Sequence, residues 1–254
     1  MRAVRAGLAR LVLLLCLVLS QAEAGWAATF TVNPVQVFLS SRTRSAILTL
    51  RNTSGETLRF QLDVFAWDQN ERGEMRLQPT RDIVFFPALL TLAPGEERNV
   101  RVGSTTPAGA VEKTYRLFIE EMRPPAGAVL PAGHVRVLTK VGIPIFIDPV
   151  QSKAAVQVDA VTLRSGQLSF EVRNTGTIHL VVQGVRLTGY DRGGQQVLEG
   201  ALDGWYVLPG GVRRYDLPLP PADCPKVRSL GIEVSTNRAT VSERLEAAAG
   251  SCAP

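Results

Sequence analysis

The residues that could do chemistry in this 254-residue chain are few and far apart. Its two histidines, His134 and His179, each stand in a segment of alternating apolar and polar residues, which is typical of a strand histidine with satisfied hydrogen bonds. Glu120 and Glu121 could suggest acid–base catalysis, but neighbours on a strand face opposite sides and cannot share a site. The sequence has no cysteine–histidine cluster with metal spacing, no phosphate-binding loop and no nucleophile-elbow motif. We therefore expect no enzyme, metal, cofactor or small-molecule substrate.

The first 24 residues have the pattern of an export signal. Three arginines precede an apolar run over residues 11–19, and Ala22 and Ala24 flank Glu23 in a cleavage pattern, with a second pattern at Gly25–Ala27. The run is too short to span a bilayer comfortably. We expect residues 1–24 to be removed on export to the periplasm, which lowers the net charge from +5 to +3. Such a weak charge without blocks of like sign gives no support for nucleic acid as a partner.

Export also decides how the cysteines are interpreted. Cys16 leaves with the signal, and Cys224 and Cys252 remain in an oxidising compartment. A bridge between them would close a loop of about 29 residues and contribute about 3–4 kcal/mol in the chain-entropy model. We predict this disulfide; the alternative is two unrelated thiols, one of them on a frayed tail.

Short alternating segments separated by turn residues dominate the rest of the chain. This pattern predicts an all-β protein. The expected strands include residues 46–52, 59–67, 98–103, 115–121, 168–174, 179–187 and 230–235. The single helix candidate is Val241–Ala249, near the end of the chain.

Two pieces of sequence recur in the same order. LTLRNTSGETLRFQL (48–62) is echoed by FEVRNTGTIHLVV (170–182), and LAPGEERNVRV (92–102) is echoed by VLPGGVRRYDL (207–217). Two copies of one β-domain explain this order better than a single large barrel, and each copy has the size of an immunoglobulin-like sandwich. We expect two consecutive immunoglobulin-like β-sandwich domains, residues 25–148 and 149–254, with a cleft between them.

One segment runs directly into the expected domain joint: HVRVLTKVGIPIFIDP, residues 134–149. It begins as an alternating strand with Val135 and Val137 on one face, and then becomes almost wholly apolar. Alternation by itself favours burial of these valines in the core of their own domain. The other reading is that they are presented to a partner.

The ordered segments together resemble one family, the periplasmic chaperones that assemble pilus subunits in the chaperone–usher pathway. LAPGEERNVRVGSTTP (92–107) resembles the family's Pro-Gly turn and the strand that follows it, and FTVNPVQVFL (30–39) resembles the first strand. TLRNTSGE (49–56), YRLFIEEMRPP (115–125) and VRVLTKVGIPIFIDP (135–149) resemble the next strand and turn, the penultimate strand and the last strand of the first domain. The resemblance covers nearly the whole exported chain.

The resemblance implies a binding function. Pilus subunits lack the last strand of their own sandwich, and these chaperones lay their last first-domain strand into the gap, which is a form of β-augmentation. By position, the donated row would be Val129, Val135 and Val137. The implied partners are pilus subunits and an outer-membrane usher, and the exposed strand could also let free copies self-associate.

The family also holds the terminal carboxylate of the subunit with an arginine of the first strand and a lysine of the last. Gln36 and Gly142 stand at those positions here, so this chain resembles a divergent branch. Arg116 and Lys140 lie nearby in the expected strands, and we predict that they form the anchor; the alternative is that both are solvated surface cations.

A different class of protein fits some of the same features. A secreted β-sandwich adhesin or structural surface protein would also be exported and all-β, but its last strand would be used fully in its own core. A carbohydrate-active enzyme would need two carboxylates facing one cleft, and the sequence offers no such pair.

Overall fold

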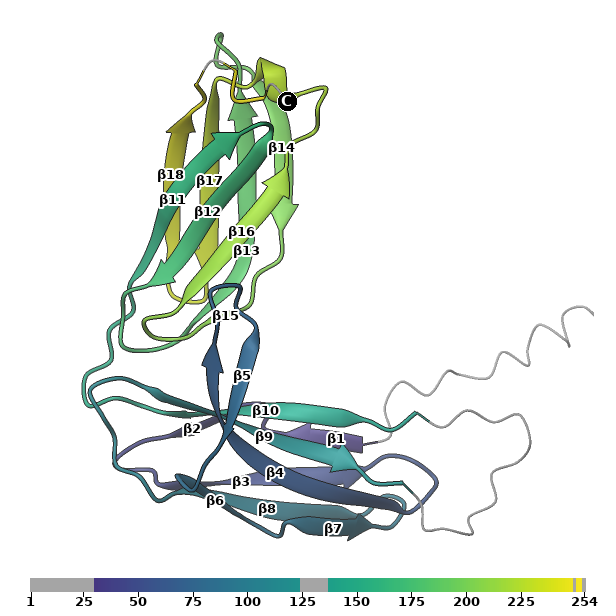
Figure 1. Cartoon of the computed structure of the whole chain (residues 1–254). Coiled ribbons are helices and arrows are strands. Elements are labelled where there is room, and N and C mark those ends of the chain that lie inside the picture. The colour runs from purple at the N-terminus through teal and green to yellow at the C-terminus, as the bar shows by residue number, and fades with distance from the viewer. Residues whose placement is uncertain (1–29, 124–136, 249, 253–254) are drawn as a thin grey trace, which may run out of the picture.

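The computed structural model describes residues 30–123, 137–248 and 250–252. The export signal with Cys16, together with Val129, His134 and Val135, therefore lies outside the described residues. The described chain is all-β and forms two sandwiches set at an angle to each other (Figure 1). This arrangement confirms the predicted fold class. Among the described residues, no helix has the length and apolarity that a membrane span needs.

The first sandwich packs two sheets around an apolar core. One sheet has the order β1 (Phe30–Asn33), β3 (Ser45–Asn52), β8 (Glu97–Ser104) and β6 (Ile83–Phe86). The other has the order β2 (Val37–Leu39), β10 (Lys140–Ile147), β9 (Lys113–Glu121), β4 (Leu58–Gln69) and β5 (Met75–Pro79), with β7 (Leu89–Leu92) also paired to β4. Alternate residues of these strands point inward, as a period of two requires, and fully buried members include Leu48, Phe60, Leu117 and Ile145.

The second sandwich repeats this plan with fewer strands. Its smaller sheet has the order β11 (Val156–Arg164), β12 (Gln167–Asn174) and β16 (Val212–Pro218). Its larger sheet has the order β14 (Gln196–Leu202), β13 (Leu180–Tyr190), β17 (Ser229–Thr236) and β18 (Thr240–Glu246), with β15 (Tyr206–Val207) also paired to β13. Phe170, Leu187 and Ile232 are among the buried residues of this second core.

The helix expected over Val241–Ala249 is wrong. Residues 240–246 form β18, which pairs antiparallel with β17 from Ser235↔Thr240 to Ser229↔Glu246. Val241 and Leu245 pack against the second core while Glu243 between them is exposed. Pairing with β17 therefore overrides the local helix preference, which was weak in such a short segment.

The two domains join between β10 and β11, that is, between Ile147 and Val156. A domain boundary at 148–149 remains a prediction. Figure 1 also shows a second connection in space, because the hairpin of β4 and β5 rises from the first domain to the base of the second. At its tip, the carbonyl of Glu71 accepts a hydrogen bond of 3.0 Å from the backbone N–H of Arg214.

The two remaining cysteines lie far from this joint. Cys224 opens a short 3₁₀ turn, Cys224–Lys226, and its sulfur is joined to that of Cys252, with the two Cα atoms 5.7 Å apart. The bridge ties the end of the chain to the second core, against which Cys252 packs.

Candidate functional site

The last strand of the first domain has one open edge. β10 pairs with β9 along its whole length, from Lys140↔Glu120 to Ile147↔Lys113, but β2 pairs only with Ile145–Ile147. No other described strand lies beside residues 140–144. Because the backbone N–H of Glu121 donates to the carbonyl of Thr139, alternation turns the backbone groups of Lys140 and Gly142 toward the open side. An edge of this kind is a template for another strand.

The apolar row of this segment passes from the core of the domain into solvent. Ile143, Ile145 and Ile147 are buried, and Val141 packs partly against the same core. Val137 has the same parity but is 75% exposed. The expected strand starts later than predicted, since residues 137–139 precede β10. The change from buried to exposed therefore falls where the first-domain core ends.

Arg116 lies on the opposite face of the same sheet, where the two domains meet. Its guanidinium carbon stands 4.0 Å from the centre of the Trp67 ring, and Nη1 donates a 3.0 Å hydrogen bond to the carbonyl of Gly142. Its side chain is nevertheless almost closed to solvent, with the residue 5% exposed. Within the described residues, its Nε and Nη2 atoms are buried and have no hydrogen-bond partner.

Burial lowers the pKa of Arg116 from its ordinary value, and the neighbouring Tyr206 acts in the opposite direction. An arginine stays charged even so. The result is a desolvated cation with two unused donors, partly compensated by the face of Trp67. Such a group is well suited to accept an anion, because leaving a buried charge unpaired costs free energy.

Lys140 lies on the same face but is not beside Arg116. It forms an ion pair of 2.7 Å with Glu120, and about half of each side chain is exposed. Arg116 stands opposite Pro144, four residues further along β10, which corresponds to about 13 Å along the strand. The structure thus does not bring the two predicted anchor cations together around one carboxylate.

The structure gives a reason for the two departures from the family's cations. An added Cβ at Gly142 would lie 3.0 Å from Cε1 of Phe118, so the aromatic ring takes the space above this position. Gln36 is used in the domain joint, where its side-chain amide donates to the hydroxyl of Tyr206. At both positions where the family has a cation, this chain therefore uses the space for packing or for a contact between its domains.

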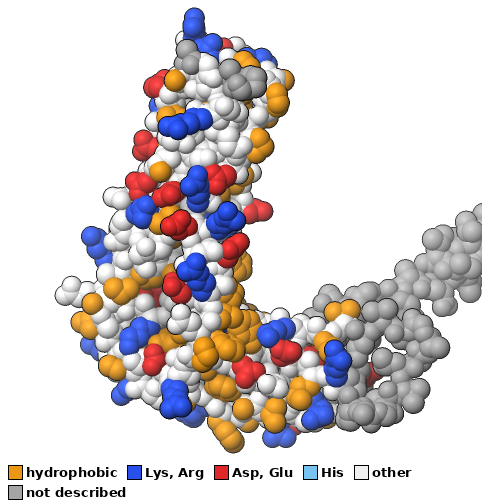
Figure 2. Space-filling model, viewed as in Figure 1, with side chains coloured by type: hydrophobic (Ala, Val, Ile, Leu, Met, Phe, Trp, Pro, Cys, Tyr) orange, Lys and Arg blue, Asp and Glu red, His pale blue; other side chains and the backbone are white. Residues whose placement is uncertain are grey.

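Side chains from both domains make an aromatic cluster at this joint. Trp67, Phe146, Tyr206 and Leu208 are buried together, and Figure 2 shows hydrophobic side chains gathered where the two domains meet. The partly exposed Phe38 stacks on Phe146, with ring centres 5.5 Å apart. Residues of both domains are thus packed together at the place where the cleft was predicted.

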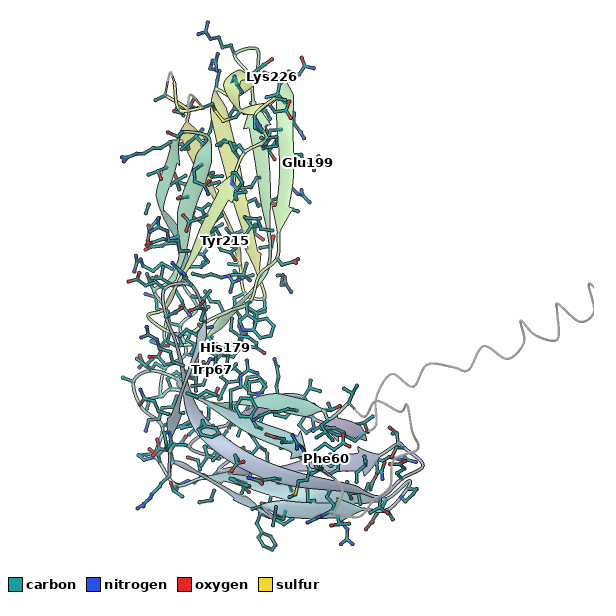
Figure 3. The ribbon with its side chains drawn as sticks, turned by 45° about the vertical axis from the view of Figure 1, so that its right-hand side comes forward. Phe60, Trp67, His179, Glu199, Tyr215 and Lys226 are labelled. Atoms are coloured by element: carbon teal, nitrogen blue, oxygen red, sulfur yellow. A yellow bond between two sulfur atoms is a disulfide. The ribbon has the colours of Figure 1, made fainter. Side chains whose placement is uncertain are left out.

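His179 belongs to this joint, which the sequence did not reveal. Its backbone N–H donates to Glu112 Oε2, and its Nδ1 lies 2.8 Å from the same oxygen. Its ring stacks on Phe146 with centres 3.8 Å apart, and Figure 3 places it close to Trp67. The histidine has a hydrogen-bond partner, as predicted, but it directly precedes β13 rather than standing within a strand. Its partner is 67 positions away in the chain, and no local pattern marks such a pair.

A family model and several solved structures match this chain, whereas no curated protein sequence matches it. The model for the pili and flagellar-assembly chaperones, PapD N-terminal domain, matches residues 29–153. This range contains β1–β10, the open edge and Arg116.

Solved chaperone structures have the same fold over both domains. The CsuC–CsuE chaperone–tip adhesion subunit pre-assembly complex from archaic chaperone–usher Csu pili of Acinetobacter baumannii matches with 18% identity and a TM-score of 0.58, covering 85% of this chain and 98% of that one. The SafA pilin–SafB chaperone complex of Salmonella enterica matches with 16% identity and a TM-score of 0.55, covering 87% and 99%. The E. coli chaperone DraB matches with 17% identity and a TM-score of 0.53, covering 86% and 97%.

The family model and the shared fold agree with the resemblance found in the sequence, and they assign the chain to a class of chaperones rather than enzymes. The chain belongs to the PapD-like family of periplasmic pilus-assembly chaperones.

Proposed function

We propose that this chaperone binds pilus subunits by donor-strand complementation along the open edge of β10 and delivers them to an outer-membrane usher. The observation that carries the proposal is the edge at residues 140–144, which pairs with no strand of the described residues on its open side, with the exposed Val137 just before it. The complexes of a chaperone with a pilin or a tip adhesin among the matching structures support subunits as the partner class.

The energetics of the proposal follow from burial. Residues before Lys140 extend the open edge when a subunit strand pairs with them, and the donated row is Val129, Val135 and Val137. Burying one valine is worth roughly 1.5–3 kcal/mol, and the backbone of the subunit gains hydrogen bonds as well. In the free chaperone the same edge could pair with a second copy.

We assign Arg116 as the inner anchor for the terminal carboxylate of the subunit, because it is a desolvated cation with unused donors beside the open edge. Lys140 stands further out along the same edge, where it can attract the carboxylate before it reaches Arg116. The anchor replaces the family's usual pair, and the chain is accordingly assigned to a divergent branch.

The remaining assignments complete the proposal. Residues 1–24 direct export to the periplasm, residues 25–148 form the chaperone domain that binds the subunit, and residues 149–254 form the second domain. The joined pair Cys224 and Cys252 keeps the end of the chain on this second domain in the oxidising periplasm.

The donor row is tested by charging it. The variant Val135→Asp with Val137→Asp should leave the free chaperone within roughly 0.5 kcal/mol per site of its normal stability, the usual range for exposed positions. It should no longer co-purify with a subunit, since an unpaired charge in an apolar groove costs several kcal/mol. Val84→Asp, at a 53% exposed valine of β6, is the matched control. Unfolding of the first domain would instead place these valines in its own core.

The anchor is tested separately. Arg116→Ala should abolish subunit capture, since removing one partner of a well-buried ion pair costs on the order of 3–5 kcal/mol. Lys140→Ala should weaken capture less, because this cation is half exposed. Co-purification of the subunit and the melting temperature are measured on each variant. Normal capture by Arg116→Ala in a folded protein would move the anchor elsewhere.

A further inference from the structure

The anchor arginine is closed off in the free protein, and its cover comes from the other domain. Arg116 rests on Trp67 from β4, while the centre of the Tyr206 ring, from β15, lies 5.5 Å from the guanidinium carbon. Both rings are themselves buried, with Trp67 3% and Tyr206 8% exposed. A carboxylate from outside thus has no direct route to the buried Nε and Nη2 atoms of Arg116.

Two glutamines of the first domain hold this cover in place. The amide of Gln36 donates to the hydroxyl of Tyr206. Gln69, at the end of β4, donates from Nε2 to the carbonyl of Tyr206 at 3.0 Å and accepts from the N–H of Leu208 at 3.1 Å. These bonds join neutral groups, so each is worth far less than a charged pair. A negative charge bound at Arg116 therefore offsets the loss of these bonds, and the strand pairing that a subunit adds offsets the lost packing of the buried Tyr206 ring on Trp67.

We propose that Tyr206 is a gate over the anchor. It closes the guanidinium of Arg116 in the free chaperone, and the terminal carboxylate of an arriving subunit displaces it. The proposal rests on the assignment of Arg116 as the anchor. A ligand can shift such an equilibrium only by its differential affinity for the two states. A free anion in solution gains only its interaction with Arg116. A subunit also pairs with β10, and this additional binding energy lets it displace Tyr206 selectively.

The closed state can be tested without any subunit, on the mature chaperone. Phenylglyoxal modifies accessible guanidinium groups, and mass spectrometry of proteolytic peptides gives the rate at each arginine. We expect Arg116 to react about tenfold or more slowly than the exposed Arg101, as for a site open less than about a tenth of the time. Tyr206→Ala should bring Arg116 close to the rate of Arg101. Gln36→Leu, which keeps the ring but removes one bond to it, should give an intermediate rate.

The control is Tyr215→Phe, which alters a buried tyrosine of the second core that stacks on Phe170 and should leave the rate at Arg116 unchanged. If Tyr206→Ala lowers the melting temperature of the second domain below the assay temperature, Gln36→Leu and Tyr206→Phe serve instead. Rapid modification of Arg116 in the unaltered protein would overturn the gate. Continued protection in the folded Tyr206→Ala variant would overturn it as well.

A second arm measures capture of the subunit that co-purifies with the chaperone, by stopped-flow fluorescence. Tyr206→Ala should capture it faster, by about tenfold or more, since less than about a tenth of the free chaperone is open and competent to bind at any time. An unchanged capture rate despite an exposed Arg116 would show that the cover does not act as a gate. Normal capture by Arg116→Ala would refute the assignment of Arg116 as the anchor, and with it the role of the gate in capture. The modification rates would still show independently whether Tyr206 covers Arg116.

Discussion

The two domains contain the same buried corner, built from the two pieces of sequence that recur. In the first domain the side-chain amide of Asn52 donates to the carbonyls of Glu56, Leu92 and Ala93. In the second, Asn174 donates to the carbonyls of Ile178 and Val207. Both asparagines are fully buried. The repeat therefore has a structural role, because the Arg-Asn-Thr turn is hydrogen-bonded to the segment of the Pro-Gly turn in both copies.

The backbone of the two corners agrees in the same way. The N–H of Gly95 donates to the carbonyl of Asn52, and that of Gly210 donates to the carbonyl of Asn174, each at 3.1 Å. The corners differ in what lies next to them. The first forms its hydrogen bonds within its own domain, whereas the second continues into β15 and Leu208, which contact Gln69 of the first domain. One motif thus closes a sandwich in one copy and builds the domain joint in the other.

The largest expected effect comes from removing the corner asparagines. Asn52→Ala removes a donor that three carbonyls share, although the carbonyl of Ala93 still accepts from the N–H of Glu96 and that of Glu56 from the hydroxyl of Ser54. A buried polar group that loses its partner costs about 1–3 kcal/mol, and the substitution also empties a buried site, so we expect a loss of roughly 3–5 kcal/mol. Asn174→Ala should cost somewhat less but should also loosen the joint and raise the reactivity of Arg116 toward phenylglyoxal. Calorimetry of both variants checks the first expectation. Equal reactivity of Arg116 in the two would show that the second corner does not hold the joint.

The disulfide is a second difference between the copies. Replacing Cys224 and Cys252 with serine should lower the stability of the second domain by about 3–4 kcal/mol, as expected for a closed loop of this length. The first domain, which has no cysteine among its described residues, should melt as before. Thiol titration of the unaltered exported protein without reductant should find no free sulfhydryl. Two reactive thiols would contradict the bridge.

The smallest effect should be the same in both copies. Gly95 and Gly210 have φ angles of +77° and +72°, and nothing lies within 4 Å of an added Cβ at either. Gly95→Ala and Gly210→Ala should therefore each cost about 1–2 kcal/mol, from backbone strain alone. Urea unfolding measures the two values. A clearly larger loss for Gly210→Ala would mean that the joint adds strain to the second turn.

The first-domain edge could be predicted in outline but not in its limits. The family resemblance pointed to the segment that contains β10, whereas alternation by itself favoured burial of its valines; Val137 is exposed. The point at which the strand begins depends on its pairing with β9, which starts at Lys140↔Glu120, and the extent of the open edge depends on β2, which pairs with only three residues of β10. The separation of Lys140 from Arg116 likewise follows from the register between β9 and β10, and register is a property of paired strands.

The sequence by itself determined the all-β class, the two repeated sandwiches, the corner motifs and the family. These depend on the period of two and on local turn chemistry, which neighbouring residues specify. The tertiary structure alone decided that Arg116 is covered, that His179 binds Glu112 and that residues 240–246 form a strand. The physical reason is distance along the chain: Gln36 and Tyr206 are 170 positions apart, and their contact exists only because two folded domains meet at one angle.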